Sequence, residues 1–259
     1  MSLGEWARTA HEVGLDAIDV SMLLIKAHTP SYLKGIRREI ESENMSLTMV
    51  TTYPDFSHPA AQQRGRELEY LRSDIAVASQ LGAKYLRVTA GQAHPQTPLK
   101  EGIEWVVENF KYACEISEKY DVKLVYENHS KTEAWEYLDF SHPTGVFLEI
   151  VEKTKDSDLG INFDTANTVA YGDDPIPVLS TILDRIETVH AAETVTKGSL
   201  TPTLLGTGLV PFQEIFSLLK KSGFDGWICM EEASNSGFRG VRMAAEFVRK
   251  TWNRCLIAD

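Results

Sequence analysis

Three carboxylates and one imidazole lie near the ends of four apolar, strand-like segments of the chain. LVYENH contains Glu127, LGINFD ends on Asp164, IETVHAA contains His190 and WICMEEA contains Glu231. Burying an unpaired carboxylate costs roughly several kcal/mol or forces it into its neutral form, so each group needs a partner. A divalent ion binds such oxygen and nitrogen ligands and stabilises the ionised carboxylates. The residue types therefore predict a metal centre formed by these four side chains.

The alternation of side chains along a strand supports this prediction, because residues two apart point to the same face. The opposite face of each segment is the more apolar one, as packing against helices requires. Taken singly, a carboxylate at a strand end is more often a helix cap or a salt-bridge partner. The combination on four strands favours metal binding instead. The pairs that share a face are Val125 with Glu127, Asn162 with Asp164, Thr188 with His190, and Cys229 with Glu231.

The elements that carry these residues alternate between strand-like and helix-like patterns. Helical periodicity is clear where Leu68, Leu71, Ile75 and Ala78 share one face. Links from helix to strand are short and contain Gly, whereas links from strand to helix are longer, which is typical of a barrel with its active site at the C-terminal ends of the strands. We therefore predict an α/β fold, a (β/α)8 TIM barrel, as a single domain over 1–259. The predicted strands are 17–21, 47–53, 85–90, 123–128, 159–164, 186–192 and 227–233.

Seven strands are visible where an eight-stranded barrel needs one more. The absent strand should be the first, because the chain starts directly with SLGEWARTAHEVGLD, a predicted helix. Either the natural chain starts further upstream, or the barrel is open between its last and first visible strands. An open edge would seek a partner, so we expect a homo-oligomer.

Composition excludes several classes of function. The formal charge of −11 and the lack of a basic stripe argue against nucleic-acid binding. No apolar run approaches the ~20 residues of a membrane helix, and the N-terminal residues do not resemble a signal peptide. Three scattered cysteines, Cys114, Cys229 and Cys255, are typical of reduced thiols, so we expect a cytoplasmic protein.

Four further residues are candidates for contact with a substrate. His58 and His129 lie in loops, where a histidine is more often solvated or locally hydrogen-bonded. Arg87 lies within a strand, so its charge faces either a helix end or the barrel mouth, where it would bind Glu127 or substrate. Lys197 lies in the longest glycine-bearing loop and is either a solvated lysine or a group that reaches the site when the loop closes.

Several motifs together resemble one family, the xylose-isomerase-like TIM barrels, also called the sugar phosphate isomerase/epimerase or AP-endonuclease-2 superfamily. The resemblance covers nearly the whole chain. It implies the barrel fold, and it implies that Glu127, Asp164, His190 and Glu231 bind the metal, with Glu127 and Glu231 on opposite sides of the substrate. The motifs are FSHP (56–59), LGAKYLRVTAG (81–91), ENH (127–129), DTAN (164–167), GTGLVPF (206–212) and GFDGWICMEE (223–232), together with the strand of His190.

This chain departs from the family pattern at two positions that the resemblance places among the substrate-binding residues. Many members carry His where this chain has Asn167, and many carry a Lys-Asp pair where it has Ala192 and Glu193. The second change removes a cation, so a phosphorylated or carboxylated substrate is less expected. The lack of a cysteine ligand favours Mn²⁺, Mg²⁺ or Co²⁺, while Zn²⁺ stays possible.

We therefore expect a metal-dependent isomerase or epimerase that acts on a ketose or related sugar. Glu127 or Glu231 would remove a proton next to a carbonyl and form an enediolate. A sugar or cyclitol dehydratase on the same metal site and a non-catalytic barrel subunit are the alternatives. A DNA-repair endonuclease with three zinc ions would need more histidines at strand ends than this chain offers.

Overall fold

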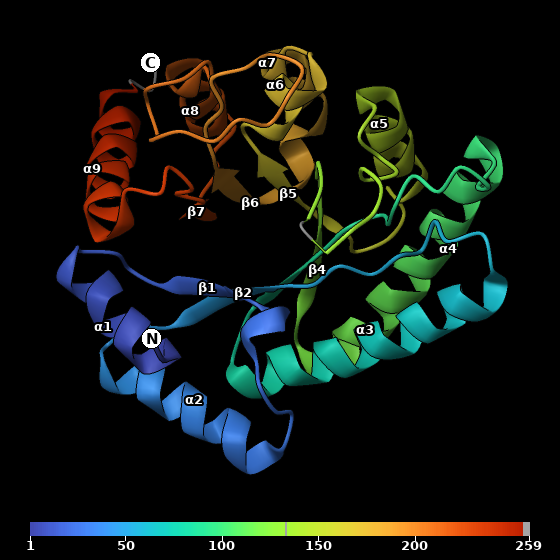
Figure 1. Cartoon of the computed structure of the whole chain (residues 1–259), viewed down its shortest axis with the longest axis horizontal. Helices are drawn as coiled ribbons and strands as arrows, with labels where there is room; N and C mark the ends of the chain where they lie inside the picture. The colour runs from blue at the N-terminus through green and yellow to red at the C-terminus, as the bar shows by residue number, and fades with distance from the viewer. Residues whose placement is uncertain (133, 256–259) are drawn as a thin grey trace. The chain divides into compact units, whose positions relative to one another are not determined.

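The computed structural model describes residues 1–132 and 134–255, in which helices and parallel strands alternate along the chain (Figure 1). The strands are β1 (Ile18–Ser21), β2 (Leu47–Thr51), β3 (Tyr85–Val88), β4 (Lys123–Glu127), β5 (Gly160–Asp164), β6 (Ile186–Ala191) and β7 (Trp227–Met230). The α-helices are α1 (Leu3–Glu12), α2 (Pro30–Ser42), α3 (Ala61–Leu81), α4 (Leu99–Ser117), α5 (Thr144–Lys153), α6 (Asn167–Tyr171), α7 (Pro175–Ile182), α8 (Phe212–Lys221) and α9 (Gly237–Arg254).

The described residues form two compact units. The first contains Met1–Tyr126, 134–140 and Glu149–Gly160, and the second contains Glu127–Thr132, Ser141–Leu148 and 161–255. In the first unit β1, β2, β3 and the body of β4 pair in parallel in chain order. In the second unit β5, β6 and β7 do the same. This parallel β/α arrangement confirms the predicted TIM-barrel class, with seven strands among the described residues and α1 ahead of β1.

Apolar strand residues build the core, as expected for parallel strands whose two faces are both covered. All five residues of β2 are buried, and so are the predicted helix-face residues Leu71, Ile75 and Ala78 of α3. Gly82 follows α3 with a positive φ of 81°, so the chain turns directly into β3 at the glycine that the sequence indicated. No helix in the described residues combines the length and the apolar character that a membrane span needs.

The predicted strands are correct in number and place. Several of them end earlier than predicted, by at most three residues. β3 ends at Val88 instead of Ala90, and β7 ends at Met230 instead of Ala233. Glu231 thus lies just beyond β7, where its backbone N–H still donates to the carbonyl of Ala191 at 3.0 Å.

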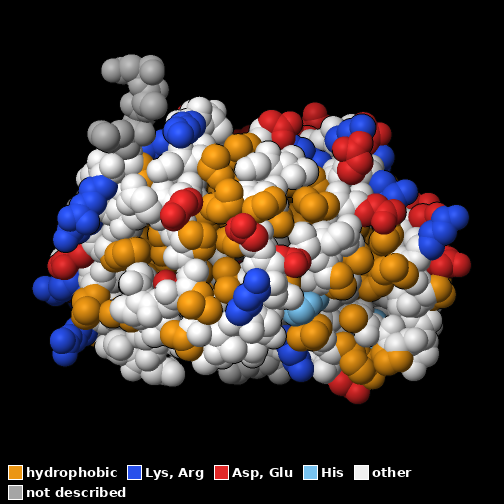
Figure 2. All heavy atoms as spheres, turned by 90° about the horizontal axis from the view of Figure 1, so that it is seen from above, with side chains coloured by type: hydrophobic (Ala, Val, Ile, Leu, Met, Phe, Trp, Pro, Cys, Tyr) orange, Lys and Arg blue, Asp and Glu red, His pale blue; other side chains and the backbone are white. Residues whose placement is uncertain are grey.

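Charged side chains of both signs reach the surface of the described residues (Figure 2). On the face shown in Figure 2, Lys and Arg side chains are interspersed with Asp and Glu, and no basic band crosses the described part of that face.

Asp74 of α3 provides a test of how the first unit is held together. Its carboxylate accepts a hydrogen bond of 2.5 Å from the Thr52 hydroxyl just after β2, and burial raises its pKa above the ordinary value. Because the folded chain then binds more protons than the unfolded chain, stability falls as pH rises from about 4 through the raised pKa. We expect Asp74→Asn, which keeps an acceptor for Thr52, to be more stable than the wild type at pH 7. The urea midpoints of the two proteins should converge towards pH 4, and a gap that is independent of pH would contradict this.

Candidate metal centre

Three of the four predicted ligands converge in the second unit. Nδ1 of His190 lies 2.9 Å from Oε1 of Glu127 and 3.0 Å from Oε1 of Glu231. One ligand atom from each of the three residues lies within 4.8 Å of the others. A ring nitrogen carries at most one proton and cannot donate fully to two carboxylates, whereas a cation between them would accept its lone pair and balance both charges. The donor set therefore fits a divalent ion.

The three side chains converge because each lies at or just beyond the C-terminal end of a strand. Glu127 is the last residue of β4, His190 is the last but one of β6, and Glu231 follows β7. The side chains of Glu127 and His190 are 1% and 0% exposed, whereas that of Glu231 is 48% exposed. The group thus has a buried side and a side open to solvent, as a site for a small molecule requires.

Asp164, the fourth predicted ligand, lies beside this group at the end of β5, directly paired with His190 in the strand register. Burial raises its pKa well above the ordinary value, and the carboxylates of Glu231 and Glu127 raise it further. Its Oδ1 accepts backbone N–H bonds from Ala166 at 2.9 Å and Asn167 at 2.7 Å, so this oxygen holds the turn that starts α6. Asp164 is not among the three residues whose ligand atoms converge, and its role as a ligand stays a prediction.

Thr165 connects the C-terminal end of β5 to the C-terminal end of β6 by hydrogen bonds that the sequence did not predict. Its N–H donates to the carbonyl of His190 at 3.0 Å, and its hydroxyl donates to the carbonyl of Ala192 at 2.7 Å and accepts the Ala192 N–H at 3.0 Å. The backbone that carries His190 is therefore fixed from the neighbouring strand. The only sequence signal was the position of Thr165 directly after Asp164.

Four of the six predicted substrate-binding residues lie in the same unit as the converging group, and Asn167 and His129 are two of these four. Asn167 is 5% exposed, and its Oδ1 has no hydrogen-bond partner among the described residues. An unsatisfied buried acceptor is costly, so this amide suits a ligand that donates a hydrogen bond, such as a hydroxyl. His129 is 9% exposed, and its backbone carbonyl accepts the Tyr171 hydroxyl at 2.5 Å.

Glu193 is a buried residue in the segment that follows β6. It is 2% exposed, and its carboxylate accepts backbone N–H bonds from Thr194, Gly206 and Val210 at 3.0 to 3.2 Å. These bonds close the loop of residues 194–210 onto one side chain. They identify Glu193 as the anchor of this loop, and any contact with substrate stays a prediction.

Lys197 is exposed near the tip of the same loop. The next residue, Gly198, donates its N–H to the carbonyl of Val169 at 3.0 Å, which ties the tip to α6. The Thr194 hydroxyl connects the two ends of the segment 194–201. It accepts the Thr201 N–H at 3.0 Å and donates to the Ser199 carbonyl at 3.1 Å. The loop is thus fixed at both its base and its tip, and Lys197 extends from a defined backbone.

The first unit holds the other two predicted residues. Arg87 is 2% exposed, donates to the Thr52 carbonyl at 3.2 Å and lies 4.3 Å over the ring of Tyr53. His58 accepts the Ala60 N–H at its Nδ1, and its ring lies 4.7 Å from that of His94. Within this unit both residues have local structural partners, and whether either touches a substrate stays a prediction.

An Asp-His pair in the first unit was missed by sequence reasoning. Nε2 of His94 lies 2.7 Å from Oδ2 of Asp55, and the backbone and side chain of Gln92 also donate to this carboxylate at 3.0 and 3.2 Å. His94 lies in the long link after β3, and that link length was its only signal. The pair orders the loops that follow β2 and β3.

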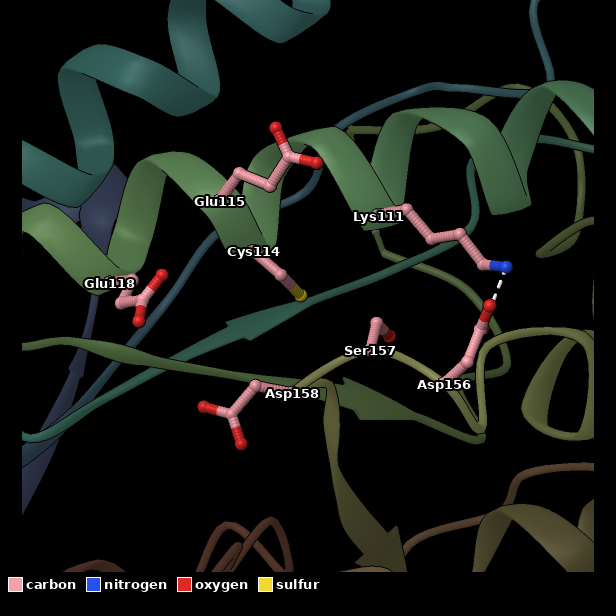
Figure 3. A pocket seen from close by; sticks show the side chains of 7 residues that line it. All are labelled: Lys111, Cys114, Glu115, Glu118, Asp156, Ser157 and Asp158. Carbon is pink, nitrogen blue, oxygen red and sulfur yellow. Dashed lines mark ion pairs between the residues drawn. The ribbon is translucent and has the colours of Figure 1, made fainter.

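A pocket of about 350 Å³ also lies in the first unit, between α4 and the residues that precede β5 (Figure 3). Its lining includes Glu115, Glu118 and Asp158, and an ion pair of 2.7 Å joins Lys111 to Asp156. Both partners of this pair are more than a third exposed, so the pair contributes little to stability. The pocket contains none of the predicted site residues.

Comparison with known proteins decides the family. Residues 7–251 match the family model of the xylose isomerase-like TIM barrels. The chain belongs to this family. A solved structure, described as IOLI protein with a binding zinc atom, superposes on this chain with a TM-score of 0.83. The sequence identity is 16%, and the alignment covers 100% of this chain and 95% of the other chain. That identity establishes a shared fold alone.

Two curated relatives carry the names of enzymes. The chain is 22% identical over 231 residues to an inosose dehydratase from Clostridium tetani, covering 78% of this chain and 74% of that protein. It is 24% identical over 243 residues to a putative hydroxypyruvate isomerase from Streptomyces coelicolor, covering 89% and 85%. The family thus contains members named for dehydration and for isomerisation.

Removal of the Glu193 carboxylate should release the loop of residues 194–210. We expect Glu193→Ala to increase the rate of tryptic cleavage after Lys197 by roughly tenfold or more, because each buried N–H that loses its acceptor costs about 1–3 kcal/mol. Glu193→Gln keeps one acceptor oxygen and should show a smaller increase. Mass spectrometry of timed digests follows the fragment that ends at Lys197.

Glu214→Gln provides the matched control, because Glu214 is exposed on α8 in the same unit. This variant should be cleaved after Lys197 at the wild-type rate. Equal cleavage rates for Glu193→Ala and the wild type would show that the carboxylate does not anchor the loop.

Proposed function

We propose that this protein is a divalent-metal-dependent isomerase or epimerase that acts on a ketose or related sugar. The observation that carries the proposal is the convergence of Glu127 and Glu231 on the same nitrogen of His190. Two carboxylates and an imidazole within 4.8 Å of one another combine ligand atoms with groups that can accept a proton. The family membership of the chain supports the same class of reaction.

Glu127, His190 and Glu231, joined by Asp164, would hold the ion. When bound, a divalent ion supplies the positive charge that makes a proton next to a carbonyl acidic and stabilises the enediolate. The chemistry of the donor set, which is oxygen and imidazole nitrogen without sulfur, favours Mn²⁺, Mg²⁺ or Co²⁺ and is compatible with Zn²⁺.

The two glutamates would divide the proton transfer. One carboxylate removes the carbon-bound proton, and its partner returns a proton to the opposite face, which gives an epimer. Their different exposure favours different exchange with solvent: Glu231 is 48% exposed and Glu127 only 1%. A proton taken by Glu231 can therefore exchange with water more readily than one taken by Glu127.

A neutral polyhydroxylated substrate fits the second unit better than an anionic one. The Oδ1 atom of Asn167 suits a hydroxyl, and the position of Glu193 carries a carboxylate that would repel an anion. Small neutral sugars or cyclitols are thus the proposed ligands, rather than nucleic acid. Homo-oligomer formation and a cytoplasmic location remain predictions from the sequence.

The second candidate is a dehydratase for a sugar or cyclitol. It is favoured by the similarity to a protein named inosose dehydratase over 78% of this chain. The first step is the same removal of a proton next to a carbonyl, after which loss of a β-hydroxyl replaces reprotonation. Product analysis separates the two candidates.

Solvent-deuterium exchange tests the shared first step. We expect the Mn²⁺-loaded protein to incorporate deuterium into at least one member of a panel of ketoses and ketocyclitols, and a chelator should abolish the signal. Glu127→Gln and Glu231→Gln should each lower the exchange rate by roughly 100-fold or more, because each removes a proton acceptor. Mass spectrometry of the recovered sugars measures the exchange.

Glu232→Gln is the matched control, because Glu232 lies in the same loop and its carboxylate accepts the Ser234 N–H instead of joining the converging group. It should exchange at the wild-type rate. Metal-loaded protein that exchanges deuterium into no member of the panel would count against both candidate reactions.

A further inference from the structure

Asn128, the residue after Glu127, makes three hydrogen bonds with residues at the end of β5 and in α6. Its Oδ1 accepts the backbone N–H of Asp164 at 2.8 Å, and its Nδ2 donates to the backbone carbonyl of Asp164 at 2.9 Å and to the hydroxyl of Thr168 at 3.1 Å. Asn128 is 1% exposed, so water does not compete for these bonds. All of these residues belong to the second unit.

Two of the bonds reach both backbone groups of a single residue, Asp164. A side-chain amide offers an acceptor and two donors in one plane, so it can pair with a peptide as a neighbouring strand would. The reversed orientation of the amide would place N–H against N–H and oxygen against oxygen, so the contacts fix one orientation. Asn128 therefore pairs with the backbone of Asp164 from the position directly after Glu127.

This pairing has a consequence for the two neighbouring carboxylates. Asn128 follows Glu127 directly in the chain. Its side chain forms hydrogen bonds with both backbone groups of Asp164, the residue that carries the second carboxylate. Oδ1 of Asp164 is itself held by the N–H groups of Ala166 and Asn167. The backbone of Asp164 and one of its carboxylate oxygens are thus both fixed, and the remaining oxygen can point in few directions.

We propose that Asn128 is a positioning residue that sets the Asp164 carboxylate against Glu127 for metal binding, an inference that rests on the proposed metal centre. Residues that orient metal ligands in this way typically change affinity by 10- to 100-fold when they are replaced. Asn128 touches neither substrate nor metal in this role. It acts through the position of Asp164.

The test is the affinity of the metal-free full chain for Mn²⁺, measured by titration calorimetry beside the melting temperature and near-ultraviolet circular dichroism. Asn128→Leu has a similar volume and removes all three bonds, and we expect it to weaken Mn²⁺ binding 10- to 100-fold. Asn128→Ser leaves room for water and should act in the same direction, so it decides the question if the Leu variant does not fold. A purely structural role would lower the melting temperature and leave the affinity unchanged.

Two variants serve as controls. Thr168→Val removes one bond of Asn128 but leaves both bonds to Asp164, so Mn²⁺ affinity should stay within about threefold of the wild type. Tyr171→Phe removes the hydroxyl that donates to the carbonyl of His129, the residue after Asn128, and it leaves the bonds of Asp164 intact. The Mn²⁺ affinity should again stay within about threefold of the wild type.

The outcomes separate this inference from the proposed function. If the wild type binds no Mn²⁺, the metal centre is wrong and the role of Asn128 falls with it. If the wild type binds Mn²⁺ and a folded Asn128 variant binds it equally well, only the positioning role is overturned.

Discussion

The structure of the second unit depends on one electrostatic constraint: two carboxylates approach the same imidazole nitrogen. At 2.9 and 3.0 Å, Nδ1 of His190 offers either one N–H or one lone pair, so it can serve only one of the two contacts well. Glu127 and His190 are almost completely buried, so little water reaches their contact, whereas Glu231 is 48% exposed and faces solvent. An arrangement of this kind is stable when a cation lies among the groups, and it is costly when none does.

The fold holds these groups together in spite of that cost. Each side chain extends from the end of a parallel strand, and the ends are tied to one another by side chains that bond to backbone, such as Thr165 between β5 and β6. Burial and the neighbouring glutamates raise the pKa of Asp164, which means that its ionised form is destabilised in the folded chain. The hydrophobic core of the strands supplies the free energy that keeps such groups in place, as is typical of functional sites.

The sequence predicted the strands and the convergence of Glu127, His190 and Glu231, because both follow from short-range patterns. Apolar runs with a period of two mark strands, and polar residues at their ends mark the mouth of a barrel. The sequence did not reveal the Asp55–His94 pair or the loop that Glu193 anchors, because these contacts join residues whose loop conformations no local pattern specifies. Glu193 illustrates what the sequence could not predict. The family resemblance placed this residue near substrate, but the conformation of residues 194–210 determines which N–H groups its carboxylate accepts.

The division between strand ends and loops also explains how one family holds members named for different reactions. Under the proposed function, removal of a proton next to a carbonyl would need only the charge and the carboxylates at the strand ends, and this step would begin either an isomerisation or a dehydration. What happens to the enediolate depends on whether a β-hydroxyl is held in line to leave, which is decided by loop residues around the ligand. In this chain Asn167 stands on α6, and the loop of residues 194–210 is tied to the same helix through Gly198. The position of α6 therefore affects both the Asn167 amide and the loop. Under the proposed function, the choice between reprotonation and loss of water should depend on this helix more than on Glu127, His190 and Glu231.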